Sequence, residues 1–163
     1  FSPTDSPEIK SLLPIAILFE KLKVLVGKKF KNPGHDQERN RGADLHRMIC
    51  NELGYSTYSD TGRFPDITNQ LLEVKLQTSP TIDLGLVSPD SKESLDLITQ
   101  EEIHLMHCDV RYAIFYGHVI DEEVVLTNFY LSTGEKFFTR FPKFQGKVIN
   151  SKIQIPLPVA FFN

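Results

Sequence analysis

The sequence predicts a mixed α/β fold (α+β), in which helices flank a central mixed β-sheet. Within the expected strand 71–78, residues 72–77 alternate strictly between apolar and polar side chains, the pattern of a strand with one buried face. Residues 110–119 form an unbroken β-prone run, which is typical of a central strand covered on both faces. Helical stretches are expected at residues 8–26, 42–53 and 91–107, so helices and strands alternate along the chain.

Length and composition indicate one globular domain. At 163 residues, with 40% apolar and 24% charged side chains, the chain can build its own core. No apolar run approaches the roughly 20 residues of a membrane span, and no secretory signal is visible. Cys50 and Cys108 lie far apart without a CxxC spacing, so we expect two reduced core thiols in a cytoplasmic protein. Because the chain begins with Phe1 and not Met, we expect residues 1–163 to be a processed protein or a single domain of a longer one.

Charge is distributed unevenly along the chain, although the formal net charge is only −3. Residues 21–41 carry seven Lys or Arg and two acids, and residues 136–152 carry five Lys or Arg and no acid. Residues 60–130 hold thirteen acids and four bases. Two basic flanks around an acidic centre fit a phosphate-binding rim around a metal site, whereas either flank alone is equally typical of a solvated surface.

The first helical stretch and the connection after it carry the N-terminal candidates. Residues 8–26 are rich in apolar side chains, which suits either a scaffold helix or a dimer surface, and Pro14 should kink or shorten this helix. The polar connection 27–42 is long for a structureless loop, so it is either a flexible linker or a DNA contact. Its candidate DNA-binding residues are Lys28, Lys29, Lys31, Arg39, Asn40 and Arg41.

The second helix is expected to run from Gly42 to about Leu53, with Gly54 as its stop signal. Glu52 falls in the middle of the apolar stripe of this helix. A carboxylate buried there needs a partner because an unpaired buried charge is very costly. In the last turn of a helix, however, the side chain can also bend out to water, and the sequence leaves both readings open.

Residues 64–79 are predicted to form a β-hairpin that brings three charged side chains together. With Asn69-Gln70 as a two-residue loop, Asp66 lies opposite Glu73. Two carboxylates roughly 5 Å apart across a ladder repel each other. A divalent cation between them reverses that cost, because Mg²⁺ prefers oxygen ligands. Lys75 projects from the same face as Glu73, so the pattern indicates metal-assisted chemistry on an anion.

The string Pro65-Asp66 followed by Glu73-Val74-Lys75 resembles the PD-(D/E)xK nuclease superfamily, which contains most type II restriction endonucleases. The resemblance covers roughly residues 42–120, and only these letters are diagnostic. It implies a restriction endonuclease-like αβββαβ core with helices on both sides of the sheet. It also implies that Asp66 and Glu73 hold Mg²⁺ and that Lys75 positions or activates the attacking water. Gln77, on the same face, would steady the nucleophile or a phosphate oxygen.

Members of this family often carry an acidic residue near the metal, on the helix that precedes the hairpin. Glu52 is the candidate in this chain. The stretch Asn40-Arg41-Gly42 is similar to the Asn-Lys-Gly that starts this helix in many restriction enzymes, but the later glycines are absent. That departure leaves the register open, so His46 and Asp44 are the alternatives to Glu52.

The rest of the chain is expected to add a helix at 91–107, the strong strand, and a partner strand at 124–131. His104 and His107 lack a third ligand at matching spacing and are therefore more typical of surface or packed histidines. Beyond Gly134, phenylalanines alternate with basic residues, among which Arg140 and Lys143 are DNA-binding candidates. The same phenylalanines fit a satellite core at least as well.

The resemblance implies a Mg²⁺-dependent endodeoxyribonuclease that cleaves phosphodiester bonds of double-stranded DNA. The most direct form is the catalytic domain of a bacterial type II restriction endonuclease, acting as a homodimer on a two-fold symmetric site. A repair nuclease or junction resolvase with the same centre is the alternative within this class. A non-catalytic DNA-binding or protein-interaction module is the alternative outside it. A further domain of the same chain is another candidate partner, and no membrane is expected.

Overall fold

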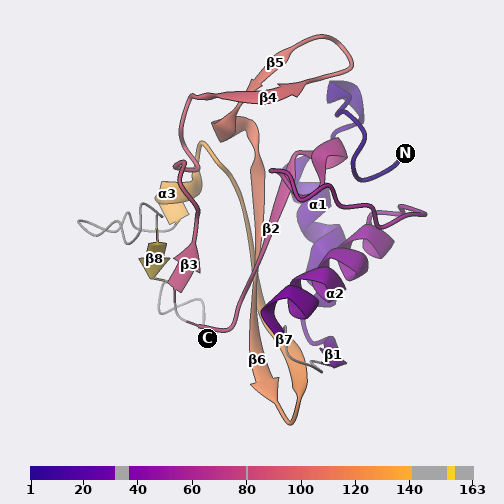
Figure 1. The fold of residues 1–163 in the computed structure, drawn as a ribbon, viewed down its shortest axis with the longest axis vertical. Coiled ribbons are helices and arrows are strands. Elements are labelled where there is room, and N and C mark those ends of the chain that lie inside the picture. Colours follow the sequence, from indigo (N-terminus) through magenta and orange to yellow (C-terminus); the bar gives the residue numbers. More distant parts are fainter. Residues whose placement is uncertain (32–36, 80, 141–153, 157–163) are drawn as a thin grey trace.

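The described residues build their fold on a four-stranded mixed sheet, in agreement with the predicted fold class. A computed structural model describes residues 1–31, 37–79, 81–140 and 154–156 (Figure 1). The helices are α1 (Ile15–Leu22), α2 (Gln37–Glu52) and α3 (Phe137–Arg140). The strands are β1 (Lys29–Lys31), β2 (Leu72–Gln77), β3 (Thr81–Asp83), β4 (Ser94–Ile98), β5 (His104–Met106), β6 (Arg111–Ile120), β7 (Glu123–Thr133) and β8 (Gln154–Pro156). The order in the main sheet is β1-β7-β6-β2, with β2 parallel to β6 and the other pairs antiparallel.

Strand β6 lies inside this sheet, as predicted for residues 110–119. Its first seven residues are buried, and it pairs with β2 on one side and with β7 on the other. The predicted return strand is also confirmed, because β7 spans residues 124–131. Asp121 and Glu122 make the turn between β6 and β7 with φ angles of 49° and 65°. Two left-handed residues in succession match the twist of a β-hairpin.

The two faces of the sheet carry separate apolar clusters. On one face, α1 and α2 pack over the apolar side of β2, so the alternation predicted for residues 71–78 is confirmed. The β2 side chains on this face are Leu72, Val74 and Leu76. The opposite face is covered by β3 and the single-turn helix α3, so the two long helices do not flank the sheet on both sides as predicted. The second cluster includes Ile82, Tyr112, Ile114 and Phe137.

Residues 91–107 form a β-hairpin, and the helix predicted there was wrong. Strands β4 and β5 pair antiparallel, and exposure alternates residue by residue along β4. Leu95 and Leu97 are the half-buried positions, whereas Ile98, which the helical pattern required inside, is 46% exposed. The true period is therefore two and not 3.6. The chain reverses near Glu102, whose φ is 63°.

Both N-terminal helices have boundaries that differ from the predictions. Helix α1 begins directly after Pro14, which confirms a shortened helix, and only part of it is buried. Helix α2 begins at Gln37 rather than Gly42, because the residues before Gly42 are good helix formers and the glycine is tolerated inside the helix. Part of the connection expected as a loop is strand β1. Within the described residues, no helix is long and apolar enough to cross a membrane.

The turn before β2 is longer than the predicted two-residue loop. Ile67 and Leu72 exchange backbone hydrogen bonds of 2.9 and 3.0 Å, so the predicted register is right. The link between them is a 3-10 helix, Thr68–Gln70, followed by Leu71 with a φ of 48°. The arm that carries Asp66 is therefore not a strand, and the Ile67–Leu72 pair is an isolated bridge to β2.

A buried arginine holds this turn in place. The Arg111 side chain, only 8% exposed, donates hydrogen bonds to the backbone oxygens of Leu13 and Gln70 and to the Gln70 side-chain oxygen at 3.1 Å. The Gln70 side chain in turn accepts from the Leu13 N–H at 2.9 Å and donates to the Ser11 carbonyl at 3.1 Å. Burial lowers the pKa of Arg111 to about 10. The network joins the entry to α1, the 3-10 turn and the start of β6.

We expect Arg111→Ala to lower the free energy of unfolding by about 3 kcal/mol, because it leaves several buried carbonyl groups without donors. Arg111→Met, which keeps much of the side-chain volume, should recover only part of this loss. Urea denaturation measures both, with Arg63→Ala as an exposed control that should change stability by less than about 0.5 kcal/mol. Wild-type stability in Arg111→Ala would show that the turn is held by other contacts.

Candidate metal centre

The structure brings together Asp66, Glu73 and Lys75 at one edge of the main sheet. The Asp66 N–H donates to Glu73 Oε1 at 3.1 Å. Lys75 Nζ lies 3.2 Å from Glu73 Oε2, so the two oxygens of Glu73 face two different neighbours. The side chains of Lys75 and Glu73 are 24% and 10% exposed. The cluster is thus accessible through Lys75 while the Glu73 carboxyl stays almost covered.

The position of Asp66 follows from the fact that β2 is an edge strand. Its outward N–H groups have no neighbouring strand to receive them. Asp66 Oδ2 accepts one of these hydrogens, from Val74, at 2.9 Å. The side chain of Asp66 therefore replaces a ladder partner for one residue, which holds its carboxylate beside the start of β2.

The Glu73 carboxyl is costly to ionise in this cluster. Burial, followed by the negative charge of Asp66, raises the pKa of Glu73 to about 8, and the Lys75 ammonium opposes the shift without cancelling it. The negative charge of Asp66 thus acts on Glu73 although the Asp66 arm is not a strand. A bound cation would favour the charged form of Glu73 and relieve this cost.

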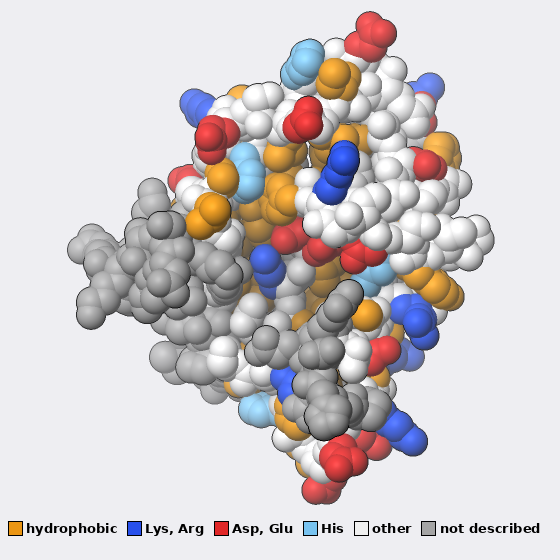
Figure 2. All heavy atoms as spheres, in the orientation of Figure 1, with side chains coloured by type: hydrophobic (Ala, Val, Ile, Leu, Met, Phe, Trp, Pro, Cys, Tyr) orange, Lys and Arg blue, Asp and Glu red, His pale blue; other side chains and the backbone are white. Residues whose placement is uncertain are grey.

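Asp66 also faces a pocket of about 600 Å³ between α2 and the edge of β2. The pocket is lined by Gly42 and His46 of α2, by residues 60–62, and by Val74 and Leu76 on the floor. Figure 2 shows acidic side chains gathered near the centre of the face in view, with basic and hydrophobic side chains beside them. Asp66 is the member of the cluster that reaches the pocket, since Glu73 and Lys75 point to the other face of β2.

Of the three helix candidates, His46 lines this pocket and Glu52 and Asp44 do not. Glu52 is the last residue of α2 and is half-buried. His46 is 8% exposed, and its Nε2 lies 3.6 Å from the thiol of Cys50. Both cysteines are buried and free, and burial raises the pKa of Cys50 to about 11.

Asp60 is a pocket residue that the sequence did not single out. It lies in an exposed loop with no periodicity, eight residues after Glu52, so no sequence pattern connects it to the pocket. Its carboxylate is close enough to contribute to the raised pKa of Cys50. Only the folding of the 55–63 loop against α2 brings it there.

The donor set of the cluster fits Mg²⁺ in part. Within the described residues, no group of three or more His, Cys, Asp or Glu side chains is arranged to hold a metal ion. Mg²⁺, however, commonly takes one or two carboxylates and completes its octahedron with water and substrate phosphate. Asp66 and Glu73 supply that number of carboxylates. A cation bound there would offset the cost of ionising Glu73 beside Asp66.

The predicted DNA-binding residues are spread over two edges of the sheet. Lys29 and Lys31 lie on β1, at the edge opposite β2, and Lys29 is 3.5 Å from Glu123. Arg41 lies close to β2, where its Nη1 donates to Thr78 Oγ1 at 3.3 Å. Lys28 and Asn40 are exposed, and Gln77 is half-buried on β2 on the same face as Lys75. The side chains of Arg39 and Arg140, and all of Lys143, lie outside the described residues.

The phenylalanines after Gly134 are described only at the start of that segment. Phe137 is fully buried and Phe138 packs beside it, so these two belong to the satellite core that the sequence allowed. His104 is exposed and His107 is packed, as expected for histidines without a metal.

We expect Glu73→Gln to stabilise the metal-free protein at neutral and alkaline pH. The pKa of Glu73 is raised in the folded state, so folding favours its protonated form. The contribution of Glu73 to the free energy of unfolding is therefore fully present below pH 4.5 and is lost as the pH rises toward about 8. Gln keeps an acceptor for the Asp66 N–H and carries no charge. At pH 8 the variant should unfold at a free energy higher by on the order of 1–2 kcal/mol, with a smaller difference at pH 5. Urea denaturation between pH 5 and pH 8 measures the effect. A difference in the free energy of unfolding between the two proteins that stays the same at every pH would contradict it.

Comparisons with known proteins leave this centre to be judged on its own geometry. No protein-family model, curated protein or solved structure matches the chain. The features that indicate a function are therefore the geometry of the Asp66–Glu73–Lys75 cluster and the resemblance of the Pro65–Lys75 string to one nuclease motif.

Proposed function

We propose that this chain is a Mg²⁺-dependent endodeoxyribonuclease of the PD-(D/E)xK kind, cleaving double-stranded DNA at the Asp66–Glu73–Lys75 cluster. One observation carries the proposal: at an accessible sheet edge, a nearly buried Glu73 carboxyl accepts from the Asp66 N–H and lies 3.2 Å from the Lys75 ammonium, and the negative charge of Asp66 adds to the raised pKa of Glu73. Such an arrangement is costly for a merely structural cluster, because two acids share one site. A site for a cation and an anionic substrate explains all three charges.

Asp66 and Glu73 would hold the metal. When bound, Mg²⁺ polarises a phosphate oxygen and lowers the pKa of a coordinated water. Asp66 is oriented for this role by its hydrogen bond from the Val74 N–H, and Glu73 by those to the Asp66 N–H and Lys75. Both carboxylates are therefore pre-positioned by the fold before any ligand arrives.

Lys75 supplies the positive charge at the exposed side of the centre. Its ammonium is the most accessible charged group of the pair with Glu73, at 24% exposure. From that position it can donate hydrogen bonds to an attacking water or to a phosphate oxygen. Gln77 lies two residues further along the same face, where its amide can steady the same groups.

The architecture supports this reading in part. A helix packed on a strand that runs parallel to a buried neighbour, as α2, β2 and β6 do, is compatible with a restriction endonuclease-like core. The β4–β5 hairpin stands where that core has its second helix, which is a departure from the family pattern. A type II restriction enzyme acting as a homodimer on two-fold symmetric DNA remains the biology that we propose.

We expect Asp66→Ala and Lys75→Ala each to lower Mg²⁺-dependent cleavage of plasmid DNA at least about 100-fold. Lys23→Ala is the matched control, because Lys23 is an exposed lysine of the opposite layer, paired with Glu20, and its loss should leave the rate unchanged. EDTA should abolish cleavage by the wild type. Cleavage that survives either substitution would refute the assignment of these residues.

We expect Arg41→Ala to weaken DNA binding, because Arg41 lies on α2 and its side chain reaches Thr78, directly after β2. Loss of one phosphate contact should reduce the slope of log affinity against log salt by about 1. Arg47→Ala, on the same helix, is the control and should leave the slope unchanged. Fluorescence anisotropy with a labelled duplex, in Ca²⁺ and in EDTA, measures both. Binding that ignores the divalent ion, together with no cleavage, would favour the non-catalytic module.

A further inference from the structure

A stacked pair of rings lies immediately behind the arm that carries Asp66. The Phe64 ring lies 4.5 Å from the His107 ring, centroid to centroid, and the two planes differ by only 7°. Phe64 also meets the Tyr112 ring at 6.2 Å in a tilted arrangement. Phe64 precedes Asp66 by two residues, so this stack fixes the chain on the N-terminal side of the carboxylate.

His107 connects the stack to the strand pair below Glu73. The Tyr112 hydroxyl lies 3.2 Å from His107 Nε2, and the Tyr112 ring is fully buried. In the parallel ladder Tyr112 is the partner of Glu73, so their side chains share one face of the sheet. Burial, and after it the charge of Glu73, raises the pKa of Tyr112.

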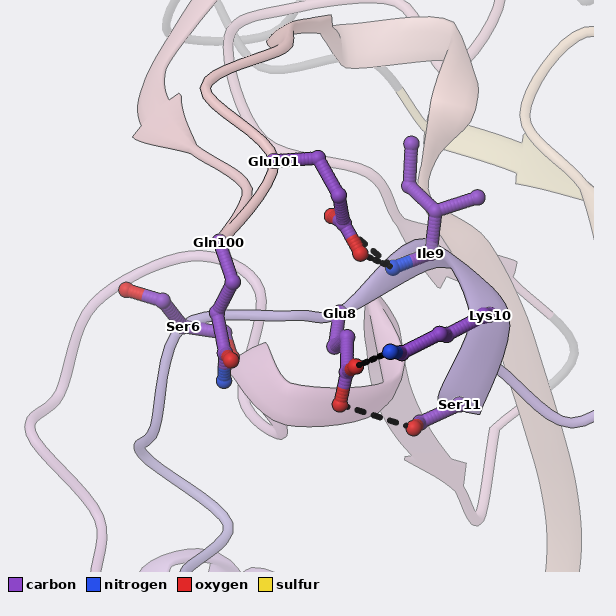
Figure 3. A network of polar contacts seen from close by, with 7 residues as sticks. All are labelled: Ser6, Glu8, Ile9, Lys10, Ser11, Gln100 and Glu101. Atoms are coloured by element: carbon purple, nitrogen blue, oxygen red, sulfur yellow. Dashed lines mark hydrogen bonds and ion pairs between the residues drawn. The ribbon is translucent and has the colours of Figure 1, made fainter.

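His107 is itself held firmly from outside the sheet. The backbone N–H of His107 donates to the Glu93 carbonyl at 2.8 Å, at the base of the β4–β5 hairpin. The far end of that hairpin is fastened to the N-terminal segment (Figure 3). There the Glu101 carboxylate accepts from the Ile9 N–H at 3.0 and 3.2 Å, and the Gln100 side chain donates to the Ser6 carbonyl at 3.2 Å. The hairpin is therefore a fixed mount for the His107 ring.

The Asp66 arm is held on both sides of the carboxylate. Toward β2, the Ile67–Leu72 bridge and the hydrogen bonds of Asp66 to Val74 and Glu73 hold it. On the N-terminal side, residues 56–64 are exposed, and the Phe64 stack restrains the chain two residues before the carboxylate. A ligand has to be held close to its productive place for full affinity, and its supporting residues set that precision.

We propose that Phe64 and His107 are positioning residues for the metal centre, and that their stack, together with the hydrogen bonds of Asp66 to β2, keeps the Asp66 carboxylate beside Glu73. The inference rests on the proposed function for its link to metal, but the positioning itself exists in the metal-free protein. Tyr112 holds the His107 ring in the plane that Phe64 stacks on. The β4–β5 hairpin, which replaces the helix expected from the sequence, thereby acquires a role in the site.

Phe19 offers a matched control for Phe64. Each phenylalanine is 37% exposed, and each stacks on one aromatic ring, Phe19 on Phe129 at 5.4 Å. Phe19 lies on α1, on the other face of the sheet from Glu73. Truncating either ring removes a similar contact from a similar depth, so a purely structural effect should be alike in the two variants.

The first measurement is the pKa of Glu73 in the metal-free protein, followed by carboxyl-carbon NMR during a pH titration. Phe64→Ala and His107→Ala should each move it toward the ordinary value of a glutamate, because Asp66 swings away and water enters. Phe19→Ala should leave it at the wild-type value. His107→Phe keeps a ring for the stack and should also retain the raised pKa.

The second measurement is Mg²⁺ affinity by titration calorimetry on the same proteins. Phe64→Ala and His107→Ala should each weaken binding by about 10-fold, and the double variant by no more than either single one, because they remove the same stack. An unshifted Glu73 pKa in Phe64→Ala, or a shift equal to that in Phe19→Ala, would overturn the positioning role. If the pKa moves as expected while wild type binds no Mg²⁺, the positioning role stands and the proposed nuclease centre fails.

Discussion

A buried guanidinium without a carboxylate partner among the described residues is the constraint on which the site depends. Arg111 is held by backbone and amide oxygens alone, so its charge is satisfied only if the 3-10 turn and the entry to α1 stay where they are. Buried charges tolerate little rearrangement, because every lost hydrogen bond leaves a desolvated group. The turn that Arg111 fixes is the one that hands the chain from the Asp66 arm to β2.

Two opposite charges therefore lie within one residue of each other along the sheet without neutralising each other. Arg111 is the ladder partner of Leu72 and points to the helix-covered face, whereas Glu73 is the partner of Tyr112 and points to the other. The alternation of a β-strand separates them by the thickness of the backbone. Glu73 is left with Asp66 and Lys75 as its charged neighbours. Burial and then the charge of Asp66 raise its pKa, and Lys75 opposes the shift.

Local patterns predicted the parts of the fold that local physics decides. The alternation in β2, the buried run in β6 and the register that sets Asp66 beside Glu73 all follow from the period of two. The helix predicted at 91–107 was wrong. Its apolar residues fit the spacing of a helical stripe, but the half-buried positions in β4 are Leu95 and Leu97, which are two residues apart. Asp60, His46 and the Phe64–His107 stack depend on contacts between segments distant in sequence, which no single-segment pattern records.

The hydrogen bond from the Val74 N–H to Asp66 has a consequence outside chemistry. An uncovered edge strand is a template on which another polypeptide can add itself, and a carboxylate seated on its outward N–H obstructs that addition. Asp66 therefore disfavours the pairing of a second chain with the edge of β2. Selection against aggregation alone would thus favour an acidic side chain at this position, independently of metal binding.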